Sequence, residues 1–235
     1  METKKAFVRR PSARLAEGLV THIERQPVDF ELAQQQWQAY VDALHAAGWQ
    51  TIEVDPAPDC PDSAFVEDTM VVYGPVAVIA RPGADERKPE TAAAEEAARR
   101  VGYQIRHIEA PGTLDGGDVL KHGDRVWVGQ GGRTNAEGIR QLREHLAPLG
   151  ADVIAVPLSK VLHLKSAVTA LPEGTIIGYE PLVDDVESWG EGFLGMPEEA
   201  GAHVVILAPD TVLMASSAPE SVAKMQARGL NVVQV

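Results

Sequence analysis

The segment Asp115-Gly116-Gly117-Asp118 places two carboxylates around a glycine pair, directly before the apolar residues Val119 and Leu120. Glycine permits positive φ angles and a close approach of the backbone to other groups, so the pair can turn the chain sharply. Such a turn would aim Asp115 into a cleft and leave Asp118 as a structural partner of the turn. A solvated surface turn has the same composition, and the rest of the chain must decide between the two.

A second acidic loop, residues 60–68, contains Asp62, Glu67 and Asp68 shortly before another apolar run. Asp62 and Glu67 flank Phe65, which would give a pocket two carboxylates and an aromatic wall. Paired carboxylate oxygens match the planar fork of a guanidinium group. The loop therefore indicates an arginine-like ligand, with an ordinary polar loop as the alternative.

Two arginines lie in loops that open helices. Arg87 follows the turn at residues 81–85, and Arg133 follows the glycines of residues 129–132. Either could bind the carboxylate of an amino-acid substrate, or could be ordinary surface charge. The glycine-rich loop is no phosphate loop, because no Gly-Lys-Ser/Thr follows it.

His163 lies shortly before one hairpin-like stretch of the sequence, just as Asp115 lies shortly before another. An imidazole there could pass protons to a leaving amine, although a histidine among apolar residues is also typical of a core. The remaining histidines lack acidic or histidine partners at ligand spacing, so we predict no metal site and no cofactor. Cys60 is a candidate nucleophile by its chemistry alone, but its place outside the repeated loops favours a structural role.

These candidate residues lie in an internal repeat. Apolar periodicity and capping residues predict helices over residues 29–47, 90–101, 136–149 and 220–228, each followed by a glycine and a β-branched strand. Hairpin patterns stand at residues 70–79, 119–128, 167–177 and 203–214. The unit is ββαβ, about 50 residues long, a length typical of propellers and arrays.

About five such modules follow from this count, including partial ones at both ends. We expect one α/β propeller domain over residues 1–235, with the strand at residues 6–8 pairing with the last module to close the ring. Loops at one end of the first strands would then converge on the axis. Residues 179–197 carry no clear helix, and we expect the acids there, Asp184 and Asp185 among them, to form a solvated loop face.

Composition limits the kind of protein. The 235 residues carry a formal net charge of −13, from 34 acids and 21 bases, which argues against a nucleic-acid or anionic-membrane partner. A single cysteine excludes an internal disulfide and fits a reducing compartment. Neither a signal peptide nor a membrane-spanning apolar run is present in the sequence. These features favour a cytoplasmic protein with a small-molecule ligand, as a monomer or homodimer.

Taken together, the 62–68 loop, the 81–91 loop, Asp115-Gly116-Gly117-Asp118, the 133–138 loop and residues 162–165 resemble dimethylarginine dimethylaminohydrolase across essentially the whole chain. That family belongs to the guanidino-group-modifying enzymes. The resemblance implies a five-module pseudosymmetric α/β propeller of ββαβ units, the pentein fold. It also implies hydrolysis of Nω-methylated L-arginines, such as asymmetric dimethylarginine, to L-citrulline and dimethylamine or methylamine.

The resemblance implies a role for each matching residue. His163 would be the general acid and base, and Asp115 would orient it and hold the guanidinium, where many relatives have a glutamate. Substrate binding would fall to seven residues: Asp62 and Glu67 at the guanidinium, Phe65 as the wall, Arg87 and Arg133 at the α-carboxylate, and Asp68 with the backbone of Leu19 at the α-amino end.

In the family mechanism a cysteine thiolate attacks the guanidinium carbon and forms a covalent thiouronium intermediate. The resemblance places that cysteine near the C-terminus, beyond Val235. Residues 230–235 read as a strand without a stop signal. We therefore expect the C-terminal part of the last module to be absent from this chain, and the chain alone to be inactive.

Two other interpretations remain open from the sequence. An arginine or agmatine deiminase would use the same chemistry on an unmethylated guanidine. A catalytically inactive propeller could act instead as a binding module, although a binding ring would not need acids, arginines and a histidine at repeat-aligned loops.

Overall fold

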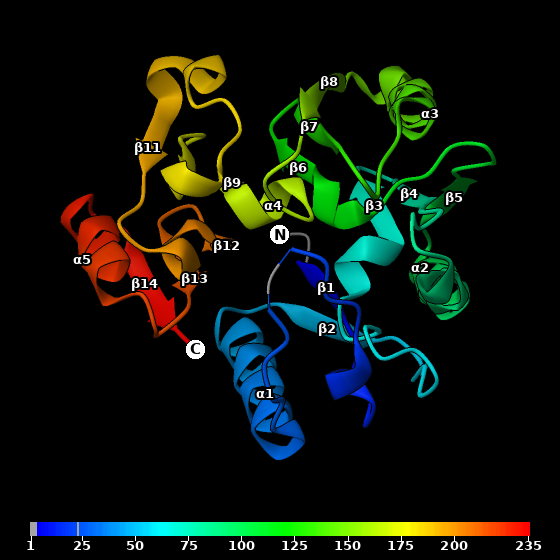
Figure 1. Cartoon of the computed structure of the whole chain (residues 1–235), viewed down its shortest axis with the longest axis horizontal. Helices are drawn as coiled ribbons and strands as arrows, with labels where there is room; N and C mark the ends of the chain where they lie inside the picture. Colours follow the sequence, from blue (N-terminus) through cyan, green and yellow to red (C-terminus); the bar gives the residue numbers. More distant parts are fainter. Residues whose placement is uncertain (1–3, 23) are drawn as a thin grey trace.

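The computed structural model describes residues 4–22 and 24–235, which form five small β-sheets arranged in a ring (Figure 1). The strands are β1 (Lys5–Val8), β2 (Gln50–Glu53), β3 (Met70–Tyr73), β4 (Val76–Ile79), β5 (Gln104–His107), β6 (Val119–His122), β7 (Arg125–Gln130), β8 (Asp152–Pro157), β9 (Val168–Ala170), β10 (Ile176–Gly178), β11 (Phe193–Gly195), β12 (Val205–Ala208), β13 (Thr211–Met214) and β14 (Asn231–Gln234).

Each sheet defines one module, numbered 1 to 5 in chain order. Modules 2 to 5 share one topology: the first two strands form an antiparallel hairpin, and the third strand adds parallel to the second. All four predicted hairpins are therefore confirmed. Module 1 contains only β1 and β2, which pair in parallel.

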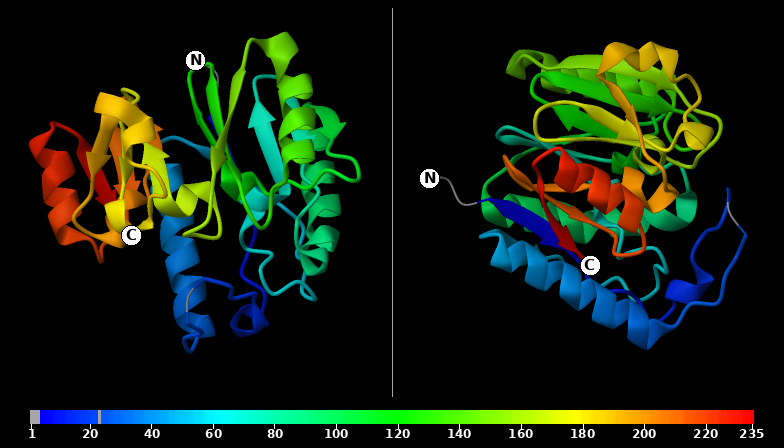
Figure 2. Two further views of the ribbon diagram at one scale, coloured as in Figure 1. Left: turned by 45° about the horizontal axis from the view of Figure 1, so that its top comes forward. Right: turned by 90° about the vertical axis from the view of Figure 1, so that its left-hand side faces the viewer.

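The long helices lie on the outside of the ring (Figures 1 and 2). They are α1 (Phe30–Ala46), α2 (Thr91–Val101), α3 (Ala136–Leu146) and α5 (Pro219–Ala227), whereas α4 (Leu164–Ala167) is a single turn. Short 3-10 turns are η1 (Leu15–Glu17), η2 (Val66–Thr69), η3 (Asp85–Glu90), η4 (Gly116–Asp118), η5 (Ala147–Leu149), η6 (Glu180–Leu182), η7 (Glu187–Gly192) and η8 (Glu199–Ala202).

The helix ends agree with the sequence prediction. The side chain of Asp29 caps α1 by accepting a hydrogen bond from the Leu32 amide at 3.0 Å. The glycines that follow the helices have φ angles of 80° at Gly48, 97° at Gly102, 82° at Gly150 and 88° at Gly229. This left-handed conformation ends the helix at little cost only for glycine.

Module 1 differs from the prediction. β1 pairs with β2 of its own module and not with the last module, so the predicted strand pairing across the ring is wrong. Modules 1 and 5 instead meet through side chains, because Val8 and Leu44 pack with Leu207 and Leu213. Trp49 Nε1 also donates to the Leu207 carbonyl at 3.1 Å.

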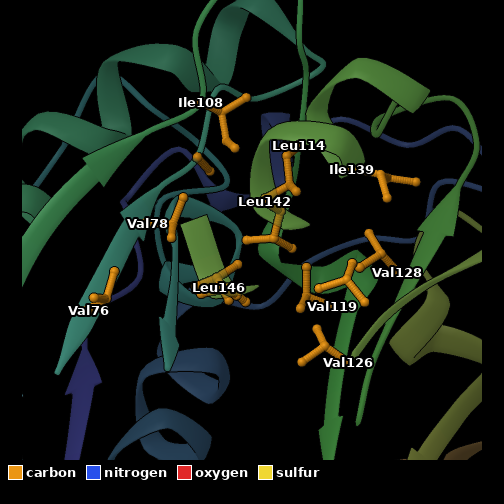
Figure 3. Close-up of a cluster of buried hydrophobic side chains, with 13 residues drawn as sticks. Val76, Val78, Ile108, Leu114, Val119, Val126, Val128, Ile139, Leu142 and Leu146 are labelled. Atoms are coloured by element: carbon orange, nitrogen blue, oxygen red, sulfur yellow. The ribbon is translucent and has the colours of Figure 1, made fainter. Parts of the chain in front are cut away.

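Apolar packing between neighbouring modules forms the core. In the largest cluster, the fully buried Leu142 and Leu146 of α3 join Val126 and Val128 of β7 and Val78 of β4 (Figure 3). The cluster couples modules 2 and 3 and so fixes the relative position of the two loops that precede β3 and β6.

Module 4 lacks an outer helix, as predicted. Residues 179–192 between β10 and β11 contain only the turns η6 and η7, and we call this segment the module-4 connector. Within residues 4–22 and 24–235, no helix is long and apolar enough to cross a membrane.

Candidate active site

The Asp115–Asp118 segment forms the turn η4 directly before β6, and both of its carboxylates are buried, at 0% exposure for Asp115 and 1% for Asp118. Its glycines are required by close approach and not by positive φ, since neither has a φ in the left-handed region. A Cβ on Gly117 would lie 2.9 Å from Cγ of His163 and would also overlap Asp68. The turn is thus packed directly against the imidazole.

His163 stands at the N-terminus of α4 and is 9% exposed. Its Nε2 lies 3.8 Å from Oδ1 of Asp68 and 3.9 Å from Oδ2 of Asp115. Its Nδ1 lies 3.4 Å from Oδ1 of Asp118 and makes no hydrogen bond in this ring orientation. The structure brings Asp115, Asp68 and His163 together from three loops. The repeat predicted that these loops converge, but the resemblance placed Asp68 at the α-amino end and not beside the imidazole.

Asp118 is the functional candidate that the sequence analysis missed. Its Oδ1 accepts the Leu164 amide at 3.0 Å and its Oδ2 accepts the Thr134 hydroxyl at 2.6 Å, so the carboxylate is fixed beneath the ring. A carboxylate at Nδ1 selects the imidazole tautomer and stabilises its protonated form. The pattern of two acids around a glycine pair could not show that both of them would face the histidine, one at each ring nitrogen.

Asp115 is buried, and few partners stabilise its ionised form. Its Oδ1 accepts the Gly83 amide at 2.9 Å, and its Oδ2 lies 3.4 Å from a guanidinium nitrogen of Arg133. Burial raises the pKa of this carboxyl, and the Gly83 hydrogen bond and the charges of His163 and Arg133 offset that rise only in part. Asp115 is therefore a carboxylate that is easily protonated.

Asp68 is also buried, but several partners stabilise its ionised form. Burial alone would raise its pKa, but His163, an ion pair with Arg87 and the Gly117 amide at 2.8 Å together hold the pKa below its ordinary value. The carboxylate therefore stays ionised beside Nε2 of His163.

Arg87 is a buried structural cation in this arrangement. It donates to Asp68, to both carboxylate oxygens of Glu90, and to the carbonyls of Asp62 and Phe65. Desolvation alone would lower its pKa, yet the two carboxylates raise it. Arg87 thus fixes the 62–68 loop against η3, and most of its donors are already used.

The charge balance around His163 favours the imidazolium. Burial alone would lower its pKa, but the nearby carboxylates of Asp118, Asp68 and Asp115 outweigh this effect and raise the pKa above its ordinary value. A histidine poised in this way can deliver a proton to a leaving group and later take one from water.

A cavity of 640 Å³ opens over this cluster and is lined by residues of all five modules. Asp68, Gly117 and His163 line it, together with the 56% exposed ring of Phe65. Glu67 also lines the cavity, but its carboxylate is paired with Lys165 at 2.6 Å. Phe65 is thus available as a wall, whereas the charge of Glu67 is neutralised.

Two predicted site residues, Leu19 and Asp62, contact each other, and neither lines the cavity. The backbone amide of Leu19 donates to Oδ2 of Asp62 at 2.9 Å.

Cys60 does not line the cavity: it is 6% exposed, and burial raises the pKa of its thiol. A thiol in such surroundings is a poor nucleophile, in agreement with the structural role favoured above.

The fold is an α/β propeller, and a cyanobacterial arginine dihydrolase domain shares it with a TM-score of 0.83 at 19% identity, over 98% of this chain and 90% of that one. No protein-family model matches the chain. A dimethylarginine dimethylaminohydrolase from Streptomyces coelicolor is 63% identical over 221 residues, which cover 94% of this chain and 85% of the relative. The chain therefore belongs to the dimethylarginine dimethylaminohydrolase family.

Two solved structures of that family are similar over the whole chain. A His-to-Gly variant in adduct with S-methyl-L-thiocitrulline has a TM-score of 0.91 at 32% identity, and a Cys-to-Ser variant from Pseudomonas aeruginosa in complex with citrulline has a TM-score of 0.90 at 32% identity. Both comparisons cover 100% of this chain and 92% of the other.

Proposed function

We propose that the protein hydrolyses Nω-methylated L-arginines to L-citrulline and dimethylamine or methylamine. The observation that carries this proposal is the buried imidazole of His163 among Asp68, Asp115 and Asp118 at the base of an open cavity. Two carboxylates face its Nε2, and such a pair suits a guanidinium group. The citrulline and thiocitrulline ligands in the structures of relatives add support.

In the proposed mechanism a cysteine thiolate attacks the guanidinium carbon. The imidazolium of His163 then protonates the leaving amine, the C–N bond breaks, and an S-alkylthiouronium remains on the cysteine. Water attacks this carbon while neutral His163 accepts one of its two protons. The thiolate then leaves, and the second proton passes to solvent as the citrulline carbonyl forms. Asp118 keeps Nδ1 protonated throughout, so that Nε2 is the nitrogen that exchanges protons.

The distances favour a different division of the binding roles from the one that the resemblance implied. Asp68 and Asp115 lie 3.8 Å and 3.9 Å from Nε2 and suit the guanidinium, Asp115 the more because its own cationic contact is long, whereas Glu67 is paired with Lys165. Asp62 and the Leu19 backbone lie together and suit the α-amino group. We keep Phe65 as the wall.

At the α-carboxylate we assign the larger part to Arg133. Arg133 makes one long contact, to Asp115, whereas Arg87 is engaged by Asp68, Glu90 and two carbonyls. An arginine with free donors can receive a carboxylate in the fork geometry.

The nucleophile in this proposal is a cysteine on a segment beyond Val235. Cys60 lies outside the cavity. Among the described residues, β1 pairs only with β2, so the edge of β1 next to the cavity can accept an antiparallel strand. Such a strand would complete module 1 on the pattern of the other four, and could present a thiol to the cavity.

The test is product analysis with asymmetric dimethylarginine, monomethylarginine, arginine and agmatine. We expect citrulline with dimethylamine or methylamine, and a 10²- to 10⁴-fold lower turnover for His163→Gln, about the contribution of a general acid and base. We expect the 235-residue chain to bind dimethylarginine without turnover, and a chain that carries the C-terminal cysteine to turn it over.

Preferential release of ammonia from arginine or agmatine would overturn the substrate assignment in favour of a deiminase. If a chain that carries the cysteine forms no citrulline, the catalytically inactive propeller is the interpretation that remains. Turnover by the 235-residue chain would contradict the proposed source of the nucleophile.

A further inference from the structure

We propose that Asp184, on the module-4 connector, is a positioning residue. It holds the His163 loop in place so that the imidazole stays next to Asp118. The His163 loop is residues 158–162, which lead from the end of β8 to His163. This inference rests on the proposed function only for its kinetic readout, and the site geometry is independent of it.

The carboxylate of Asp184 binds the His163 loop directly. Its Oδ2 accepts the amide of Ser159 at 2.9 Å and that of Lys160 at 3.4 Å, and its Oδ1 accepts the Ser159 hydroxyl. Next to it, the Val183 carbonyl accepts Lys160 Nζ at 2.6 Å. Asp184 is exposed, as expected for a solvated loop face, and its side chain is also the partner of two loop amides that would otherwise face water.

Two acids hold His163 from opposite sides along the chain. Asp184 binds the amides of Ser159 and Lys160 before the histidine, and Asp118 binds the amide of Leu164 directly after it. The position of the ring therefore depends on two carboxylates. Asp118 of module 3 holds the backbone just after His163, and Asp184 of module 4 holds the backbone just before it.

Packing also holds the His163 loop, because Val161 is buried in one apolar cluster with Leu164 and Val183. A cavity of 150 Å³ lies between Leu158, Leu164 and the connector residues Val183 and Trp189. Trp189 meets Trp127 of β7 at a centroid distance of 5.9 Å, which fixes the connector to module 3 on the far side of that cavity. Hydrogen bonds to a charged acceptor add direction to this apolar packing, because they fix the backbone amides of Ser159 and Lys160.

Asp184 remains ionised in this role. Burial alone would raise its pKa, but the hydrogen bonds from Ser159 and Lys160 lower it. The charged groups that face His163 itself are Asp68, Asp115 and Asp118, and none of these belongs to module 4. Asp184 thus acts on the imidazole through the backbone and not through its own charge.

The test is an NMR titration of His163 in Asp184→Ala, assigned by comparison with His163→Gln because the chain has seven histidines. Loss of the anchor should let the ring move away from Asp118 and Asp68, so the pKa of His163 should fall toward its ordinary value. Asp184→Asn keeps an acceptor oxygen and should give a smaller fall. The matched control is Asp185→Ala, because Asp185 accepts only the Ser188 amide inside the connector.

On a form that turns over substrate, Asp184→Ala should lower kcat about 10-fold and leave KM within about twofold, because misplacement of the acid–base group affects the transition state more than binding. A His163 titration in Asp184→Ala that matches the wild type, or an equal shift in Asp185→Ala, would overturn the inference. The titration needs no catalysis, so failure of the proposed hydrolysis would be seen separately.

Discussion

The loops before β3 and before β6 occupy equivalent places in modules 2 and 3, and each delivers a buried aspartate to Nε2 of His163. The two carboxylates differ in the cations that stabilise their ionised forms. Asp68 is paired with Arg87 and keeps a lowered pKa, whereas Asp115 has only a 3.4 Å contact with Arg133 and a raised pKa. Asp68 lies two residues before β3 and Asp115 lies four residues before β6, so equivalent loops bring acids to one imidazole from different positions and with different electrostatics.

This difference suggests a division of labour between the two loops. A carboxylate held ionised by a buried arginine gives the imidazolium a fixed counter-ion. A carboxylate that is poorly compensated gains most from an arriving guanidinium, since the ligand supplies the missing cation. Asp115 would then contribute chiefly to substrate binding, and Asp68 to the charge of His163.

The arginines provide the largest test of the comparison. Arg87→Met would leave Asp68 and Glu90 buried without their cation, and we expect a loss of about 3–5 kcal/mol in the free energy of unfolding. Arg133→Met is the matched variant in the other loop and should cost about 1 kcal/mol or less, because its ion pair is long. Urea denaturation at neutral pH measures both.

Equal losses for the two arginine variants would show that the loops are compensated alike, and would break the comparison. A stable Arg87→Met protein would also mean that the 62–68 loop does not depend on this arginine.

The point where the two loops meet gives a smaller effect. Gly117 belongs to the module-3 loop, but its amide binds Asp68 and its Cα faces His163. Gly117→Ala inserts a methyl group into both contacts, and we expect a loss of about 1–3 kcal/mol in stability, typical of overpacking. Gly132→Ala is the control, because a Cβ there meets nothing within 4 Å.

We expect the pKa of His163 to change in Gly117→Ala and to remain at its wild-type value in Gly132→Ala, as measured by NMR titration. If Gly117→Ala leaves both the unfolding free energy and the titration unchanged, then the two loops are not in the tight contact described here.

Much of this arrangement could be predicted from the sequence because it repeats. Helix-ending glycines such as Gly102 and hairpin patterns recur at similar spacing, and each is a local signal that a single module expresses in full. The same repeat predicted that the 60–68 loop, Asp115 and His163 meet at one end of the ring, without any knowledge of their contacts.

The remaining features depend on contacts between modules, which no local pattern records. Arg87 reads as a surface residue in a turn-rich loop, yet it is buried because Asp68 and Glu90 surround it. Asp184 reads as one acid among several, and only the fold brings it to Ser159. The pairing of β1 also follows from module assembly and not from its own sequence.

The smallest and most specific test is the pH dependence of stability, where the two aspartates should have opposite signs. Asp68 has a lowered pKa in the folded state, so its contribution is present above the ordinary carboxyl value of about 3.9 and is lost as the pH falls through the folded value. Asp115 has a raised pKa, so its contribution is full below about pH 3.9 and is lost as the pH rises through the folded value.

Asparagine variants separate the two cases, since each keeps an oxygen for the Gly117 or Gly83 amide. Relative to the wild type, Asp68→Asn should be least stable at neutral pH and should approach the wild type as the pH falls. Asp115→Asn should gain stability relative to the wild type as the pH rises from 4 toward neutral, about the range over which a buried carboxyl ionises. Urea unfolding at several pH values measures both differences. Slopes of the same sign would mean that the two loops hold their acids in one electrostatic state, and that the guanidinium has no poorly compensated carboxylate to bind.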